Sequence, residues 1–274
     1  MRAGFLGPAG TFSEDALLAT APAGTEAVPF VTVDAVVRAV EEGAVDRGVV
    51  PIESAAEGSV DATLDALAAS PATIVGEVVR PISHALIART DLELDRITTV
   101  ASHPQALAQC ADFLRAELPW ASALAWSSTA EAVLETSARA EPWAAIGTPR
   151  AAELYGCVVL REHIEGREGN ETRFVWIARD GEPPAGGDRW KTSLVFFGAG
   201  ASDAGWLVRC LSEFAFRGVN LTRIESRPRK DRLGQYLFFV DLEGGLREER
   251  VRAAVDGLRA HSDEVRVLGS YPAA

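Results

Sequence analysis

The sequence predicts an α/β protein with two lobes, followed by a smaller domain of βαββαβ order. Three observations support this fold class. Strand-like and helix-like segments alternate through residues 1–165, and two consecutive strand-like segments interrupt the alternation at 73–89. A segment rich in proline and glycine at 179–190 then precedes a part with a different pattern. Strands that alternate with helices are typical of a parallel sheet whose faces are covered by helices.

The first lobe is predicted from three strand-like runs, each followed by an amphipathic segment. The strands are expected at 2–8, 27–31 and 47–53, and the helices at 11–20, 32–43 and 59–70. After the interruption, the alternation resumes with strands at 97–104, 122–128 and 143–149 and helices at 105–118 and 129–140.

The interruption predicts a chain that crosses between two lobes, near 76–84 and again near 163–174. Lobe one then comprises about 1–76 and 166–180, and lobe two about 77–165. Such an arrangement predicts a cleft between the lobes at the carboxyl ends of strands.

A linker is predicted at 181–190, because its proline, glycine and charge cannot form a core. The part that follows, 191–274, has the order strand, helix, strand, strand, helix, strand, which is the ferredoxin-like pattern. These elements are expected at 192–198, 205–218, 219–228, 235–244, 247–262 and 265–271.

Composition excludes several classes of function. The net charge of −12 and the pI near 4.9 argue against a general binder of nucleic acid or acidic membranes. Three separated cysteines indicate buried thiols in a reducing compartment, and four histidines without ligand spacing predict no metal site. Neither a signal peptide nor an apolar run of about 18 residues occurs, so we expect a cytoplasmic protein without a membrane span.

Positive charge is almost entirely arginine, since Lys191 and Lys230 are the only lysines. Arginine suits forked recognition of carboxylates. The polar stretch 169–173 leads directly into a strand-like run at 174–177, and its Arg173 could bind an anion at the mouth of that strand. A solvated loop before a strand is the alternative interpretation.

Three predicted helix starts fit capping boxes, namely Thr11 with Glu14, Ser102 with Gln105 and Ser128 with Glu131. The free N–H groups at such starts favour an anion, although each box can also be only a helix cap. Glu53 and Glu57 follow another strand, and they are either an acid–base pair or surface charges.

Four motifs together resemble the prephenate dehydratase family in order and spacing. They are GFLGPAGTFSE at 4–14, VPIE with EGSV at 50–60, SHPQALAQC at 102–110 and GNETRFVWIA at 169–178. The segment GVNLTRIESRPRKDRLGQYLFFVDLEG at 218–244 is similar to that family's ACT regulatory domain. The resemblance covers nearly the whole chain. It implies a two-lobed catalytic domain like a periplasmic binding protein, followed by a phenylalanine-sensing ACT domain.

The resemblance implies decarboxylating dehydration of prephenate to phenylpyruvate, without a metal or other cofactor, in L-phenylalanine biosynthesis. Thr172 is the implied hydroxyl donor. Arg173 is implied to bind a substrate carboxylate through its forked guanidinium, and Glu53 is the candidate acid–base carboxylate. The substrate-binding candidates are Thr11, Ser13, Ser54, Ser102, Gln109 and Phe174. L-Phenylalanine is the implied effector, with candidates Gly205, Trp206, Leu207, Asn220, Leu221, Glu225 and Ser226.

The chain departs from the family pattern at two places. Ser54 and Ala55 stand where the family usually has Asn followed by Ser or Thr, so an amide offered to substrate is missing. Trp206 replaces the alanine of the family's G-A-L-V effector loop, and it either fills part of the effector pocket or packs in the core.

Three alternatives therefore stay open: a non-aromatising prephenate decarboxylase, an arogenate dehydratase and a non-catalytic amino-acid sensor. ACT domains commonly pair, so a homodimer or homotetramer is expected.

Overall fold

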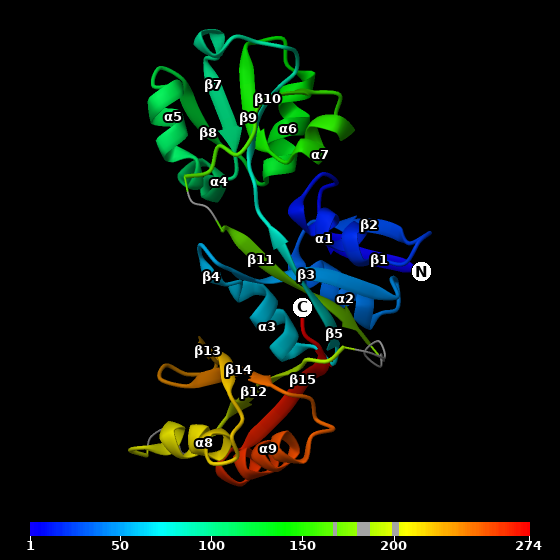
Figure 1. Ribbon diagram of the computed structural model, residues 1–274, viewed down its shortest axis with the longest axis vertical. Helices are drawn as coiled ribbons and strands as arrows, with labels where there is room; N and C mark the ends of the chain where they lie inside the picture. Colours follow the sequence, from blue (N-terminus) through cyan, green and yellow to red (C-terminus); the bar gives the residue numbers. More distant parts are fainter. Residues whose placement is uncertain (167–168, 180–186, 199–202) are drawn as a thin grey trace.

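The chain forms three α/β units arranged along one long axis, and the unit that contains the N-terminus lies in the middle (Figure 1). The computed structural model describes residues 1–166, 169–179, 187–198 and 203–274. The predicted linker at 181–190 falls mostly outside the described residues, which include only its last four positions.

The middle unit is built on a mixed sheet with strand order β2-β1-β3-β11-β5, and β4 pairs with β3. Strands β1, β2 and β3 run parallel, as the alternation predicts, and β11 is antiparallel to both of its neighbours. The strands are β1 (Arg2–Leu6), β2 (Glu26–Phe30), β3 (Arg47–Ser54), β4 (Gly58–Ser59), β5 (Thr73–Pro81) and β11 (Glu171–Ala178); the helices are α1 (Phe12–Thr20), α2 (Val33–Glu41) and α3 (Asp61–Ala69).

The second unit has a sheet of order β10-β6-β9-β7-β8, in which β7 is parallel to β8 and β9. Its strands are β6 (Ala85–Ala88), β7 (Thr99–Ser102), β8 (Ser122–Ala125), β9 (Trp143–Gly147) and β10 (Val158–Arg161). Its helices are α4 (Pro104–Gln109), α5 (Ala111–Glu117), α6 (Thr129–Ala138) and α7 (Pro149–Leu154), with a 3₁₀ turn at Leu94–Arg96.

The chain leaves the middle sheet after β5 and enters the second sheet at β6, and β10 of the second sheet is followed in sequence by β11 of the middle sheet. The two lobes also touch directly on one side. The Thr148 hydroxyl donates to the Gly10 carbonyl at 2.7 Å, the Tyr155 hydroxyl donates to Ala9 at 2.7 Å, and Arg150 pairs with Glu14 at 3.1 Å. The lobes are therefore fixed to each other along the start of α1.

The third unit has the predicted βαββαβ order, and its four strands form an antiparallel sheet of order β13-β14-β12-β15. Its elements are β12 (Trp190–Phe197), α8 (Trp206–Ala215), β13 (Leu221–Pro228), β14 (Tyr236–Glu243), α9 (Glu249–His261) and β15 (Glu264–Pro272). Residues of α8 and α9 pack on the sheet in one apolar cluster that includes Phe196, Phe214 and Leu258.

The third unit packs closely on the middle unit. A second apolar cluster contains Val175 and Ile74 of the middle unit together with Phe239 and Tyr271 of the third. At Gly269 the backbones approach so closely that an added Cβ atom would lie 2.1 Å from the Ile74 carbonyl oxygen. The two units thus share a continuous core, and a displacement of one unit would be transmitted to the other through this packing.

Candidate active site

A cavity of about 690 Å³ lies between the two lobes, where strands of the middle unit end. Leu6 at the end of β1, Ser54 at the end of β3 and Thr172 at the start of β11 contribute to its wall. The second unit contributes residues of α4 and α6. Six of the predicted site residues line the cavity: Thr11, Ser13, Ser54, Gln109, Thr172 and Phe174.

Thr172 and Ser54 lie side by side because β11 and β3 are paired in that register. Alternate residues of a strand point to the same face, so Phe174 lines the cavity with Thr172. Ser54 is buried, and its hydroxyl accepts from the Ala56 amide at 3.3 Å. A hydroxyl donor, Thr172, and an aromatic side chain, Phe174, thus line the cavity together near the start of β11.

Arg173 lies on the opposite face of β11, and neither it nor Glu53 lines the cavity. Its guanidinium contacts Glu53 at 2.9 Å, Glu77 at 3.0 Å and Asp241 at 2.5 Å. Burial acts to lower the pKa of Arg173, but the surrounding acids, led by Asp241, outweigh it and raise that pKa. The Arg173 guanidinium, which was predicted to bind a substrate carboxylate, is therefore already bound by carboxylates of the protein.

Ser102 also lies apart from the cavity wall. It is fully buried, and its hydroxyl donates to the Ile146 carbonyl at 2.7 Å. The predicted capping role of Ser102 is wrong, because His103 is the N-cap of α4 and accepts from the Gln105 amide through Nδ1. The caps at Thr11 and Ser128 are confirmed.

Two residues that the sequence did not assign join Gln109 in a polar cluster at the cavity. The ring Nε2 of His84 lies 2.8 Å from Gln109 Oε1, and the Asn170 amide donates to the same oxygen at 3.2 Å. With Oε1 accepting from both, the Gln109 NH₂ group is left to donate into the cavity. Asn170 belongs to the polar stretch that drew attention to β11, whereas His84 stands in a crossing segment without a motif.

The cavity holds little charge. Among the described residues that line it there is no lysine or arginine, and Glu131 is the single carboxylate. A bound anion would therefore meet hydroxyls, amides and the N-terminal N–H groups of α1 and α6, where the helix dipole favours negative charge. No group of His, Cys, Asp and Glu within the described ranges could hold a metal ion. A search of the same ranges finds no helix long and apolar enough to cross a membrane.

Burial lowers the pKa of His84, although Gln109 and Glu165 oppose this effect. Because the unfolded chain then binds a proton more readily, the free energy of unfolding falls as the pH drops below about 6.5, and it is unaffected by His84 above that value. We expect His84→Gln to flatten this acid-side loss, by at most about 1.4 kcal/mol per pH unit. Urea unfolding between pH 5 and pH 8 measures it. His163→Gln, at a residue with an exposed side chain, is the matched control. If the free energy of unfolding changed equally with pH in wild type and His84→Gln, His84 would not have a lowered pKa in the folded protein.

Comparison with known proteins places the whole chain in one family. The family model described as prephenate dehydratase matches residues 3–182. A prephenate dehydratase of Amycolatopsis methanolica is 40% identical, and the alignment covers 98% of this chain and 88% of that protein. Arogenate dehydratase 5 of Arabidopsis thaliana is 37% identical over 99% of this chain and 67% of its own length.

A crystal structure described as prephenate dehydratase in complex with L-Phe, from Arthrobacter aurescens, superposes with a TM-score of 0.92. It is 38% identical, and the match covers 99% of this chain and 90% of that one. The family match, the identity and the shared architecture agree over the cavity-forming lobes, and this chain belongs to the prephenate dehydratase family.

Proposed function

We propose that the cavity between the lobes converts prephenate to phenylpyruvate by decarboxylating dehydration, as a step of L-phenylalanine biosynthesis. The observation that carries the proposal is the Thr172 hydroxyl, which lines a cavity of suitable size that also has aromatic walls and little charge, in a chain of this family. A cytoplasmic location fits such a biosynthetic role.

The reaction needs little from the protein beyond position and one proton donor. The bond from the ring to its carboxylate breaks to release carbon dioxide, and the electron pair moves into the ring. The ring hydroxyl then leaves with its bonding pair and takes up a proton to form water. Aromatisation supplies the driving force, so no cofactor is required. A donor that meets the leaving oxygen as charge develops stabilises the transition state.

Thr172 is the donor in this proposal, and the polar residues of the cavity hold the dianion. Gln109, held by His84 and Asn170, donates its NH₂ group, and Thr11, Ser13 and Ser54 lie around the start of α1 and the end of β3. Phe174 provides part of the apolar wall for the ring. Arg173 and Glu53 bind each other on the face of β11 and β3 that points away from the cavity. In this proposal they hold the two strands in place and do not contact substrate.

Arogenate dehydration is the second candidate, because one relative of nearly equal identity carries that name. The two substrates differ in the side-chain keto or amino group alone. Purified protein mixed with each in turn, with phenylpyruvate and phenylalanine quantified, distinguishes them. We expect phenylpyruvate from prephenate at a higher kcat/KM. Turnover of arogenate alone would select the second candidate, and turnover of neither would favour the non-catalytic sensor.

Ser54 gives a prediction about the missing family asparagine. Changing Ser54→Asn with Ala55→Ser should raise kcat/KM for prephenate about tenfold, because a restored hydrogen bond is worth about 1–3 kcal/mol. Ala55→Ser alone, at an exposed residue, is the control. Product analysis by mass spectrometry accompanies the kinetics. A fall in native activity, with a non-aromatic decarboxylation product, would show that the site serves the other reaction.

The third unit is proposed to be an ACT domain that senses L-phenylalanine. Its βαββαβ order supports this, as does the L-Phe complex of the similar crystal structure. A smaller cavity of about 370 Å³ is lined by three of the predicted effector residues, Gly205, Trp206 and Leu207. The other four candidates, Asn220, Leu221, Glu225 and Ser226, lie at or near β13 and do not line it.

A homodimer or homotetramer is proposed on the same basis. Strand β13 is an edge of its sheet, and Ile224 on that strand is 48% exposed. Val208 beside the smaller cavity is 67% exposed. Exposed apolar side chains on an edge strand and beside the smaller cavity fit coverage by a second copy, which would complete the effector site from both chains.

A further inference from the structure

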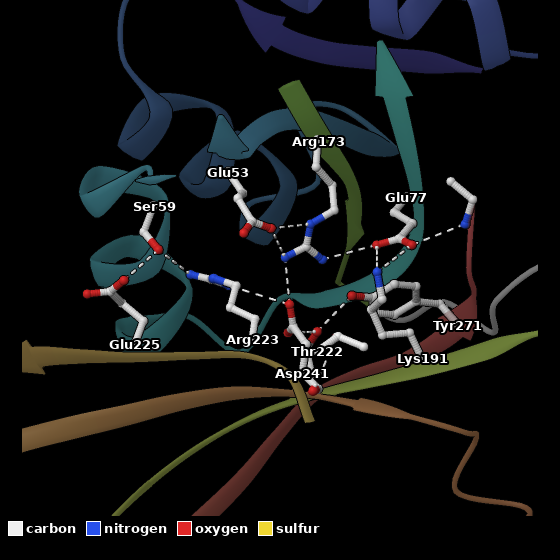
Figure 2. A network of polar contacts seen from close by, with 12 residues as sticks. Glu53, Ser59, Glu77, Arg173, Lys191, Thr222, Arg223, Glu225, Asp241 and Tyr271 are labelled. Atoms are coloured by element: carbon white, nitrogen blue, oxygen red, sulfur yellow. Dashed lines mark hydrogen bonds and ion pairs between the residues drawn. The ribbon is translucent and has the colours of Figure 1, made fainter. Parts of the chain in front are cut away.

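A buried cluster of charged side chains joins the third unit to the strand that carries Thr172 (Figure 2). At its centre, Arg173 of β11 contacts Asp241 of β14 at 2.5 Å and Glu77 of β5 at 3.0 Å. Lys191 of β12 contacts the same Glu77 at 2.7 Å. The side chains of Arg173, Glu77 and Asp241 are each no more than 8% exposed, so the contact is made away from water.

The cluster is balanced in charge, which accounts for its burial. Its cations are Arg173, Lys191 and Arg223, and its anions are Glu53, Glu77 and Asp241. Burial acts to raise the pKa of Asp241, but the charges of Arg173 and Arg223 outweigh this effect and lower the pKa below its usual value. The carboxylate therefore stays ionised. Removing one member leaves a buried charge without its partner, and the remaining groups must move to compensate.

Arg173 and Thr172 are consecutive residues on opposite faces of β11, so the guanidinium and the cavity hydroxyl share one stretch of backbone. The neighbouring strand repeats this arrangement, because Thr172 pairs with Ser54 and Arg173 pairs with Glu53. A displacement of the Arg173 side chain would therefore reach Thr172 through the backbone that the two residues share.

The same cluster continues to the edge strand of the third unit. Arg223 on β13 lies 3.6 Å from Asp241 and donates to the Ser59 hydroxyl at 3.0 Å. That hydroxyl donates in turn to Glu225 on β13 at 2.8 Å. A continuous set of contacts thus runs from the predicted effector strand through Asp241 to Arg173 (Figure 2). Arg173 follows Thr172 directly in the chain.

From this geometry we propose that Asp241 is a positioning residue for the reaction. It acts through Arg173 on the orientation of Thr172, so the third unit sets the turnover of a cavity that it does not touch. The inference rests on the proposed role of Thr172 as the hydroxyl donor. Without the Asp241 charge, Arg173 shifts toward Glu53 and Glu77, and Thr172 moves with the backbone.

The variant Asp241→Asn tests this in the full-length protein. We expect kcat for prephenate to fall on the order of tenfold with KM changed less than twofold, because a small misplacement of a catalytic group affects the chemical step. Asp65→Asn is the matched control. Asp65 also pairs across the same junction, with Arg227 at 2.9 Å, but it is not part of the cluster around Arg173. Its kcat should stay within twofold of wild type.

A double-mutant cycle separates positioning from general destabilisation. In a Thr172→Val background, where no donor remains to be misplaced, Asp241→Asn should change kcat less than twofold. Ser193→Ala provides a milder second variant if Asp241→Asn does not fold, because the Ser193 hydroxyl donates to Asp241 at 2.6 Å. It should lower kcat about threefold, with the same loss of effect in the Thr172→Val background.

Equal losses in both backgrounds, or no loss in Asp241→Asn and Ser193→Ala, would overturn the positioning role. With either outcome, Thr172→Val alone would still show its large loss of kcat, so the proposed function would stand. Full activity of Thr172→Val would instead contradict the proposed function, so the two failures are distinguishable.

Discussion

Replacing Thr172 with valine is expected to lower kcat about 10²–10³-fold, the usual cost of removing one transition-state donor. Valine has nearly the same shape as threonine, but it cannot donate to the departing oxygen. Thr172 lines the cavity as the second residue of β11, and valine is well suited to a strand, so the variant should fold with little change. Steady-state assay of phenylpyruvate measures the effect, and circular dichroism checks the fold.

Thr136→Val is the matched control for this prediction. Thr136 is buried on α6 outside the cavity, and its hydroxyl has no hydrogen-bond partner among the residues that the structure describes. The same change of side chain should therefore leave kcat unaltered. If Thr172→Val kept activity within threefold of wild type, Thr172 would not be the donor.

The second large effect is expected at Trp206, where alanine should lower the free energy of unfolding of the third unit by about 3–5 kcal/mol. The indole is 5% exposed and packs against Phe196 and Phe238, with ring centroids 6.0 and 5.8 Å away. Its N–H donates to the His261 carbonyl at 2.6 Å. The change would remove a large apolar volume and leave that carbonyl without its donor.

Urea unfolding of both proteins measures the loss, and calorimetric titration with L-phenylalanine accompanies it. Phe216→Ala is the control, because Phe216 follows the same helix but is 84% exposed, so its cost should stay below about 0.5 kcal/mol. An unchanged unfolding midpoint with tighter phenylalanine binding would mean that the indole occupies effector space and does not support the core.

The fold was predictable because its signals are local. Most strands and helices of the first 160 residues are apolar runs with the period of a strand or a helix, although α7, β10 and the division of the helix predicted at 105–118 into α4 and α5 were not predicted. Helix α8 ends at Ala215, shortly before the end predicted at 218. The crossings were visible as two consecutive strands. The antiparallel placement of β11 between β3 and β5 was not visible, because pairing between strands so distant in sequence leaves no local pattern.

The site was predictable in part. Motifs brought Thr11, Ser54, Gln109 and Thr172 to one cavity, although they come from four separate segments. Arg173 was assigned to substrate because arginine favours carboxylates. Period-two alternation already implied that it points away from Thr172, but its partners Glu77 and Asp241 could not be read from the sequence.

His84 and Ser102 show the same limit. His84 is a buried histidine in a crossing segment and belongs to no motif. The hydroxyl of Ser102 is buried and donates to a carbonyl 44 residues away. Distant polar contacts of this kind are set by the packed fold and not by neighbours in sequence.

The ratio of carbon dioxide to phenylpyruvate released from prephenate tests the central claim most directly. Labelling the ring carboxylate with ¹³C allows both products to be quantified by mass spectrometry in a single reaction with purified protein. Dehydration through the Thr172 cavity predicts equal molar amounts of the two, and both should be lost together in Thr172→Val. Carbon dioxide released in excess, with a non-aromatic organic product, would contradict it.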